Sequence, residues 1–297
     1  MTEFFIGVDG GGTGCRAVVA GSGGAILGSG RSGSANIVTD PQTALINVIA
    51  AVDNAFDDAG LDKAHYANSH AVLGLAGGNV EGAGVPIERG LPFAHSDVEF
   101  DGVIALQGAL GDQDGIVAIL GTGTAYITRR HGRIHSVGRL GVSLGRPRQR
   151  RAARSKPAAG KLLVHDGIHR RTRLTTDLLD EFDNNPPDNL VEFAWTAKPG
   201  DFGKYAPRVF QYASEGDETA RMLLERSAGY ISETLDMLIN QGGERISLLG
   251  GMAPLYVEWL PPHQQALLVA PPAADALTGA LQLALKRYGP QNGRARE

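Results

Sequence analysis

One unit of sequence occurs twice in this chain and limits the folds open to it: a β-prone apolar stretch, a glycine cluster and a second β-prone stretch. The two clusters are Asp9-Gly10-Gly11-Gly12-Thr13 and Gly121-Thr122-Gly123-Thr124. A glycine cluster between β-prone runs predicts a strand, a tight turn and a return strand. The repetition predicts a duplicated α/β fold, with one domain over residues 1–112, a second over 113–297 and a cleft between them.

Helices and further strands are expected around these hairpins. Apolar residues at helical spacing predict helices over 41–59, 204–213, 218–241 and 275–287. Short β-prone runs predict strands over 25–28, 70–75 and 246–249. The domain prediction allows for the last helix packing back on the N-terminal domain.

Both glycine clusters suit phosphate binding. Without Cβ atoms, the backbone N–H groups of Gly10, Gly11 and Gly12 can approach phosphate oxygens, and the Thr13 hydroxyl adds a donor. Asp9, at the end of the first strand, can hold Mg²⁺ through water, because Mg²⁺ dehydrates reluctantly. Either cluster alone could be an ordinary hairpin, but two of them could clamp the β- and γ-phosphates of ATP.

Two other phosphate-binding motifs are excluded. The glycines after Asp9 precede a strand rather than a helix, which rules out a dinucleotide fingerprint, and no Gly-Lys-Ser/Thr follows them. A third cluster, Gly250-Gly251, follows a buried-type strand. Its backbone could lie flat against an adenosine, and it could equally be a plain strand-to-helix turn.

Two polar residues are candidates for the acceptor substrate, each with an ordinary alternative. Asp101 precedes a possible helix, where its carboxylate could accept a hydroxyl proton during phosphoryl transfer. Spacing alone favours a helix cap at this position. Asn36 could bind sugar hydroxyls through its amide, although a turn asparagine is the more common role.

Composition and charge limit the compartment and the kinds of partner that we expect for this protein. The net charge of −4 gives no overall basic field for nucleic acid, apart from a local basic segment at 138–161. No apolar run reaches the roughly 18 residues that span a bilayer. The single cysteine, Cys15, cannot form an intrachain disulfide, and the N-terminus lacks the features of a signal peptide. We therefore expect a cytoplasmic protein without nucleic-acid or membrane partners.

The order of these motifs carries a family resemblance. The sequence DGGGT, an Asp-led segment, GTGT and then LLGGMAP resembles the BadF/BadG/BcrA/BcrD ATPase family. Within that family, the chain is most similar to bacterial N-acetylglucosamine and glucosamine kinases. The resemblance implies two ribonuclease-H-like domains of the actin/hexokinase type that close over ATP, Mg²⁺ and a sugar. Homodimers are common among such kinases.

The same resemblance assigns roles to individual residues. It implies that Asp101 is the catalytic base for transfer to a sugar 6-hydroxyl, that Asn36 and Gly77 contact the sugar, and that the glycine clusters bind the nucleotide. Phe100 stands where the family usually has a small polar residue. A second branch of the family activates 2-hydroxyacyl-CoA dehydratases through cysteine-bound iron–sulfur clusters. The location of Cys15 in the nucleotide hairpin argues against that branch.

One segment departs from the family pattern. Where the family carries GGWGFxLGDxGSG, residues 138–151 read GRLGVSLGRPRQRR, with no catalytic carboxylate. A basic surface loop is one interpretation. A shift of one base in plausible GC-rich codons can instead spell GGWGFPLGDQGSG, so we hypothesise a local frameshift over residues 138–161. The family's aspartate would then fall at about Arg146, and the chain as written would be a nucleotide- and sugar-binding protein with impaired catalysis.

Overall fold

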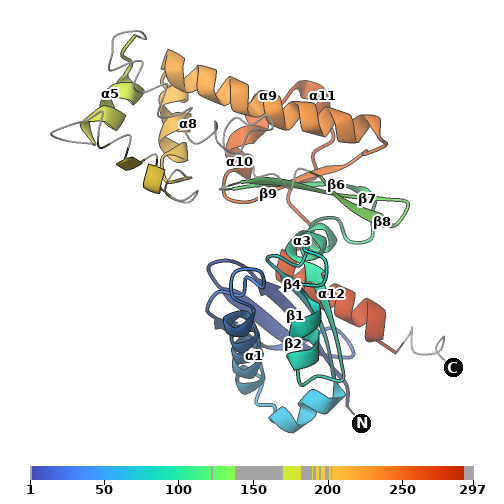
Figure 1. Ribbon diagram of the computed structural model, residues 1–297. Helices are drawn as coiled ribbons and strands as arrows, with labels where there is room; N and C mark the ends of the chain where they lie inside the picture. The colour runs from blue at the N-terminus through green and yellow to red at the C-terminus, as the bar shows by residue number, and fades with distance from the viewer. Residues whose placement is uncertain are drawn as a thin grey trace. The chain divides into compact units, whose positions relative to one another are not determined.

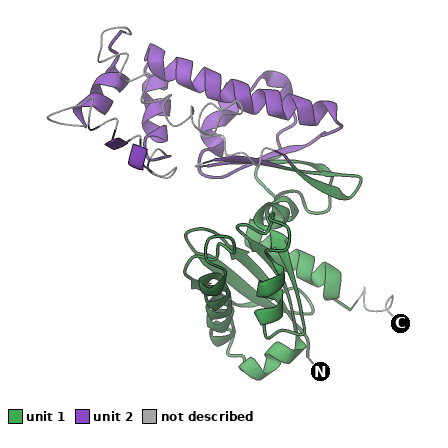
Figure 2. Ribbon diagram, in the orientation of Figure 1, with its two compact units in different colours: residues 1–117, 127–136, 269–297 green, residues 118–126, 137–268 purple. Residues whose placement is uncertain are grey.

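The computed structural model in Figure 1 describes most of the chain, in several ranges. They are residues 2–121, 123–137, 170–181, 189, 192–193, 195–197, 201 and 203–290. The chain divides into two units, coloured separately in Figure 2. Unit 1 comprises Met1–Val117, Ile127–Ser136 and Val269–Glu297, and unit 2 comprises Ala118–Tyr126 and Val137–Leu268. The domain boundary at 112/113 stays a prediction.

A mixed five-stranded sheet forms the centre of unit 1. Its strand order is β3-β2-β1-β4-β5. The bounds are β1 Phe4–Gly10, β2 Cys15–Gly21, β3 Ile26–Ser32, β4 Ser69–Leu75 and β5 His95–Phe100. The pairs β1–β2 and β2–β3 are antiparallel, whereas β4 lies parallel to both β1 and β5. The strand–turn–strand prediction around Asp9 is confirmed.

Helices cover both faces of this sheet. Figure 1 shows α1 (Pro41–Asp58) on one side and α12 (Ala276–Tyr288) on the other, where α3 (Asp101–Leu110) also packs. Alternate residues of β1 serve the two faces, because successive side chains of a strand point in opposite directions. Ile6 packs in the cluster with α1, and Phe5 packs in the cluster with α12. Two short helices, η1 (Lys63–Asn68) and α2 (Val85–Gly90), complete the unit.

The second sheet has the strand order β8-β7-β6-β9. Its strands are β6 Gly115–Leu120, β7 Thr124–Arg130, β8 Arg133–Val137 and β9 Ile246–Leu249. The division between the units runs through β6 and β7. The predicted strand, glycine turn and return strand are therefore present in this copy as well.

The helices of unit 2 form a second packed group. They are α5 (Arg173–Asp180), α8 (Ala206–Ser214), α9 (Glu218–Asn240), α10 (Ala253–Tyr256), η2 (Val257–Trp259) and α11 (Pro262–Gln265). Leu178, Tyr212 and Leu224 join α5, α8 and α9 in one apolar cluster. Asp217 caps α9 by accepting from the backbone N–H of Ala220 at 3.0 Å. No helix in the described part of the chain is long and apolar enough to cross a membrane.

A glycine in β1 allows helix α12 to lie directly against the strand. A Cβ atom on Gly7 would stand 2.6 Å from the backbone nitrogen of Leu281. Such a distance is far below van der Waals contact, so the close packing of α12 depends on the absence of a side chain at this position. The packing brings the start of α12, Asp275, to the same sheet that carries Asp9.

This contact predicts a stability difference between two matched substitutions. Gly7→Ala forces backbone to move and should lower the free energy of unfolding by about 1–3 kcal/mol. Gly21→Ala, in the neighbouring strand β2, is the control, because a Cβ there meets nothing within 4 Å. Urea denaturation of both variants measures the difference. Equal stabilities would show that α12 does not pack on β1 in this way.

Candidate functional site

The first glycine turn is held in place by hydrogen bonds from both sides. Gly11 donates its N–H to the Gly14 carbonyl at 2.8 Å and so closes the turn between β1 and β2. Ala35 donates to the Gly11 carbonyl at 2.9 Å, and Ala76 donates to the Gly10 carbonyl at 2.8 Å. Gly12 and Thr13, at the tip, are exposed. A fixed turn with an open tip suits the approach of a phosphate.

Asp9 is part of an ion-pair network that the sequence patterns did not reveal. It lies opposite Arg16 in the β1–β2 ladder, and the Arg16 guanidinium donates to Asp9 Oδ2 at 2.6 Å. A second nitrogen of Arg16 donates to Asp275 Oδ2 at 3.1 Å. Asp275 in turn caps α12 by accepting from Thr278 N at 2.9 Å. The hydrogen bond from Arg16 to Asp9 is the main reason that the pKa of Arg16 is raised.

The environment of Asp9 suits a magnesium ion held largely by its substrate. Mg²⁺ is usually bound by one or two carboxylates together with phosphate oxygens and water. Arg16 donates to one carboxylate oxygen of Asp9 and so orients the side chain. Among the described residues, no group of three or more His, Cys, Asp or Glu side chains could hold a metal by itself.

Asp101 is the first residue of α3, and Phe100 occupies the cap position without a side-chain cap. Asp101 Oδ1 accepts a hydrogen bond from Gly102 N at 2.9 Å. Burial raises the pKa of Asp101, and the negative charge of Asp9 raises it further, against the opposing effect of the Gly102 hydrogen bond. The helix-cap alternative does not describe this geometry. A carboxylate that binds protons more readily than usual is suited to general base catalysis.

Asn36 and Gly77 lie beside the first glycine turn. The side-chain oxygen of Asn36 accepts from the backbone N–H groups of Val38 and Thr39, both at 3.1 Å, so the residue also has the turn role. Its amide nitrogen is the group that could meet a sugar hydroxyl. Gly77 adopts a φ of +93°, and a Cβ there would stand 2.7 Å from Val38 Cγ2. The two segments are joined by a 3.0 Å hydrogen bond from Ile37 N to Ala76 O.

These unit 1 candidates follow the carboxyl ends of three neighbouring strands. Asp9 is the last residue but one of β1, Gly77 follows β4, and Asp101 follows β5. Because β1, β4 and β5 are mutually parallel, their carboxyl ends lie along one edge of the sheet. Open α/β sheets bind ligands at that edge.

In unit 2, the structure brings the other two glycine clusters together. Gly121 donates to the Gly123 carbonyl at 2.9 Å and closes the turn after β6. Met252 N donates to the Leu120 carbonyl at 3.2 Å, which places the Gly250-Gly251 segment against the end of β6. Thr124 begins β7, whereas Thr122 lies outside the described residues. The predicted phosphate and adenosine segments are therefore adjacent.

Residues 138–161, where the frameshift hypothesis applies, also lie outside the described part of the chain. The structure therefore does not test the proposed position of the missing carboxylate near Arg146.

Two α/β units, each with a glycine turn between adjacent strands, define the actin-like ATPase fold of the hexokinase type. A solved structure with this fold, the putative N-acetylglucosamine kinase from Chromobacterium violaceum, superposes with a TM-score of 0.81. It is 29% identical in sequence, and the match covers 95% of this chain and 99% of the other. The fold predicted from sequence is thus confirmed.

Sequence comparisons place the chain more narrowly. The model of the BadF/BadG/BcrA/BcrD ATPase family matches residues 6–265, and the chain belongs to this family. Glucosamine kinase GspK of Vibrio cholerae serotype O1 is 33% identical over 285 residues, covering 96% of each chain. N-acetyl-D-glucosamine kinase of Dictyostelium discoideum is 26% identical, with 81% of each chain covered. The predicted use of ATP agrees with the family.

The glycines at 250 and 251 differ in what they tolerate, which gives a second prediction. Gly250 has a φ of +94°, and a Cβ there would overlap the carbonyl oxygen of Leu120. Gly250→Ala should therefore lower the free energy of unfolding by about 1–3 kcal/mol, from backbone strain and displacement. Gly251→Ala, whose Cβ meets nothing within 4 Å, should stay within about 0.5 kcal/mol of the parent. Thermal unfolding of both proteins compares them; a reversed order would contradict the described turn.

Proposed function

We propose that this protein is an ATP-dependent kinase of an amino sugar, which converts N-acetylglucosamine to its 6-phosphate. The partly buried Asp101 carboxylate carries the proposal. Its pKa is raised, in part by the negative charge of Asp9, which lies near the end of β1. A phosphate-binding turn and a basic carboxylate within one unit are the two parts that phosphoryl transfer to a hydroxyl requires. The similarity to glucosamine and N-acetylglucosamine kinases supports the substrate class.

The proposed reaction assigns one role to each group. Asp101 accepts the proton of the sugar 6-hydroxyl as that oxygen bonds to the γ-phosphorus, and the bond from phosphorus to the β,γ-bridging oxygen breaks to release ADP. Gly10, Gly11, Gly12, Gly121 and Gly123 let the backbone approach the phosphates, and the hydroxyls of Thr13 and Thr124 donate to phosphate oxygens. The N–H groups of Gly11 and Gly121 hold the two turns closed. Mg²⁺, when bound through Asp9, supplies neutralising charge on the phosphates.

The remaining residues orient substrates. Gly250 and Gly251 accommodate the adenosine, while Asn36 and Gly77 contact the sugar. Arg16 holds Asp9 in one orientation. We further propose that the protein acts in the cytoplasm as a homodimer, with a small-molecule sugar as its partner and without nucleic acid.

A second candidate function follows from residues 138–151. If this segment is present as written, it lacks the carboxylate that the family motif carries there. The chain would then bind nucleotide and sugar with little turnover. A variant that carries the shifted-frame sequence over residues 138–161 separates the two functions: it should turn over sugar much faster than the written chain only if the second candidate is right.

The kinase proposal predicts the behaviour of an Asp101 variant. With Mg·ATP, the parent should release ADP on addition of N-acetylglucosamine or glucosamine. Asp101→Asn should lower kcat by about 10²–10⁴-fold, because an amide cannot accept the proton. Asp97→Asn, on the preceding strand β5 and in a part-buried ion pair with Arg287, is the control and should keep kcat within about twofold. Absence of sugar-dependent ADP release from the parent, across a panel of sugars, would refute the proposal.

The raised pKa of Asp101 also predicts how stability depends on pH. Because its folded-state pKa lies above the ordinary aspartate value, protonation of Asp101 favours the folded protein. That contribution is complete at acid pH and disappears as the pH rises through the folded-state pKa. Asp101→Asn, which mimics the protonated form, should therefore be more stable than the parent at neutral pH. The difference should vanish at acid pH, and urea unfolding at both pH values measures it. A parent more stable than the variant at neutral pH would contradict the pKa direction.

A further inference from the structure

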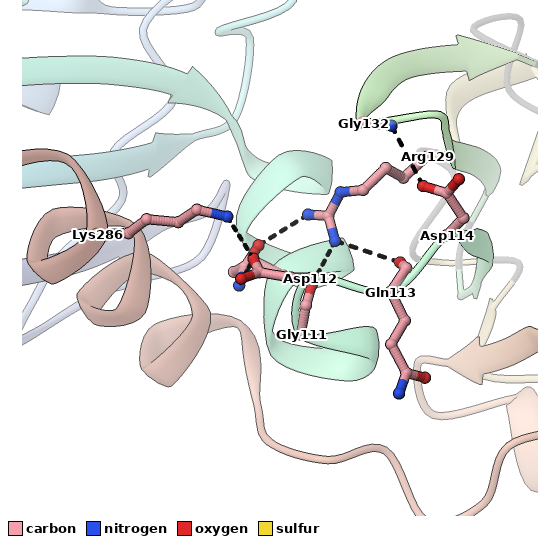
Figure 3. A network of polar contacts seen from close by, with 8 residues as sticks. Gly111, Asp112, Gln113, Asp114, Arg129, Gly132 and Lys286 are labelled. Carbon is pink, nitrogen blue, oxygen red and sulfur yellow. Dashed lines mark hydrogen bonds and ion pairs between the residues drawn. The ribbon is translucent and has the colours of Figure 1, made fainter.

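A buried arginine stands at the joint between α3 and β6. Arg129, on β7, is 6% exposed, and its guanidinium donates to three oxygens (Figure 3). These are the carbonyl oxygen of Gly111, the carbonyl oxygen of Gln113 at 3.3 Å and the side-chain Oε1 of Gln107 at 2.7 Å. All three belong to the end of α3 or to the turn after it. The guanidinium therefore holds the turn Gly111–Asp114, which we call the joint.

The acceptors of Arg129 are all uncharged. Burial lowers the pKa of Arg129, and the nearby carboxylates of Asp112 and Asp114 oppose that effect. Among the described residues, Arg129 forms no ion pair within 4.0 Å with either carboxylate. A buried guanidinium is costly unless its N–H groups are used in hydrogen bonds. An apolar residue would fill the same space at a lower cost. The arginine is thus explained by the oxygens that it gathers rather than by packing.

Other contacts tie the joint to neighbouring elements. Asp114 accepts from the backbone N–H groups of His131 at 2.6 Å and Gly132 at 3.4 Å, in the turn after β7. Asp112 accepts from Lys286 of α12 at 2.7 Å, in an ion pair whose side chains are exposed (Figure 3). The joint itself begins at Gly111, with a φ of +58°. Of these contacts, the one made by Arg129 is buried and engages two backbone carbonyls of the joint.

The joint lies between two parts of the proposed catalytic machinery along the chain. The helix before it, α3, begins with Asp101, and the strand after it, β6, ends at the Gly121 turn. β7 starts directly after that turn and carries Arg129 back to the joint. The hydrogen bonds of Arg129 therefore link β7 back to the joint from which β6 begins.

We propose that Arg129 is a positioning residue for phosphoryl transfer, which fixes the direction in which β6 leaves α3. This inference rests on the proposed kinase function. When the joint is pinned, β6 leaves α3 in one direction, and the sugar oxygen forms the new bond to the γ-phosphorus. When the joint is loose, a water oxygen forms that bond instead, and inorganic phosphate is released with ADP. Loss of Arg129 should therefore uncouple ATP cleavage from sugar phosphorylation.

The ratio of sugar phosphate to ADP tests this role. The ratio does not depend on how much of a sample is folded, so lowered stability alone leaves it unchanged. Arg129→Met keeps an unbranched side chain and removes all donors. We expect the rate of sugar phosphorylation to fall about 10–100-fold, with the sugar KM within about twofold and the ratio well below that of the parent. Arg129→Lys, which keeps the charge with fewer donors, should give an intermediate ratio.

A control on the same joint separates buried from exposed contacts. Lys286→Met removes the exposed ion pair with Asp112 and should keep the parental ratio and rate. If Arg129→Met does not fold, Gln107→Leu removes one acceptor of the guanidinium and should lower the ratio by a smaller amount.

The outcomes are distinct. An Arg129→Met or Gln107→Leu protein with a lowered Tm but the parental ratio and kcat would overturn the positioning role and leave a structural one. A parent that makes no sugar phosphate would overturn the proposed kinase function itself, and the positioning role with it.

Discussion

The burial of β1 on both faces is the constraint on which unit 1 depends. Ile6 packs toward α1 and Phe5 packs toward α12, and each fully buried side chain of this size contributes about 1.5–3 kcal/mol. Gly7 between them lets α12 reach the strand. Because β1 cannot slip without exposing these side chains, the position of Asp9 and of the glycine turn at its end is determined.

Electrostatics at the end of β1 follow from that placement. The hairpin register sets Arg16 opposite Asp9, and the close packing of α12 brings Asp275 to the other side of the guanidinium. Asp101 lies near enough for the charge of Asp9 to raise its pKa. The same burial that makes Asp101 a better base makes its ionised form unfavourable for folding, so the proposed chemistry and the stability of unit 1 oppose each other at this residue.

Much of this arrangement was predictable from local sequence patterns. The glycine clusters predicted both hairpins, because a turn between β-prone runs depends only on nearby residues. The predicted helix over 218–241 agrees with α9, since its apolar spacing and the cap at Asp217 are local signals. The position of Asp101 at the start of a helix was likewise expected. Its raised pKa was not, because that depends on burial by elements distant in sequence.

The contacts that were missed join segments far apart in the chain. The ion pair of Arg16 with Asp275 spans most of the sequence, and no local pattern reports it. The pairing of Arg16 with Asp9 could have been found by counting across the predicted hairpin. Asn36 was weighed as either a turn residue or a sugar ligand, whereas the structure uses only its oxygen for the turn. No sequence pattern singled out Arg129, and only the folded joint shows its acceptors.

The account is tested most directly by the chemical identity of the product. The protein is incubated with Mg·ATP and N-acetylglucosamine, and the products are followed by phosphorus NMR with proton correlation. We expect a new phosphate ester whose phosphorus couples to the two protons on C6 of the sugar, formed in step with ADP. Release of inorganic phosphate and ADP without any sugar ester would contradict the kinase assignment on which the roles of Asp101, the glycine turns and Arg129 depend.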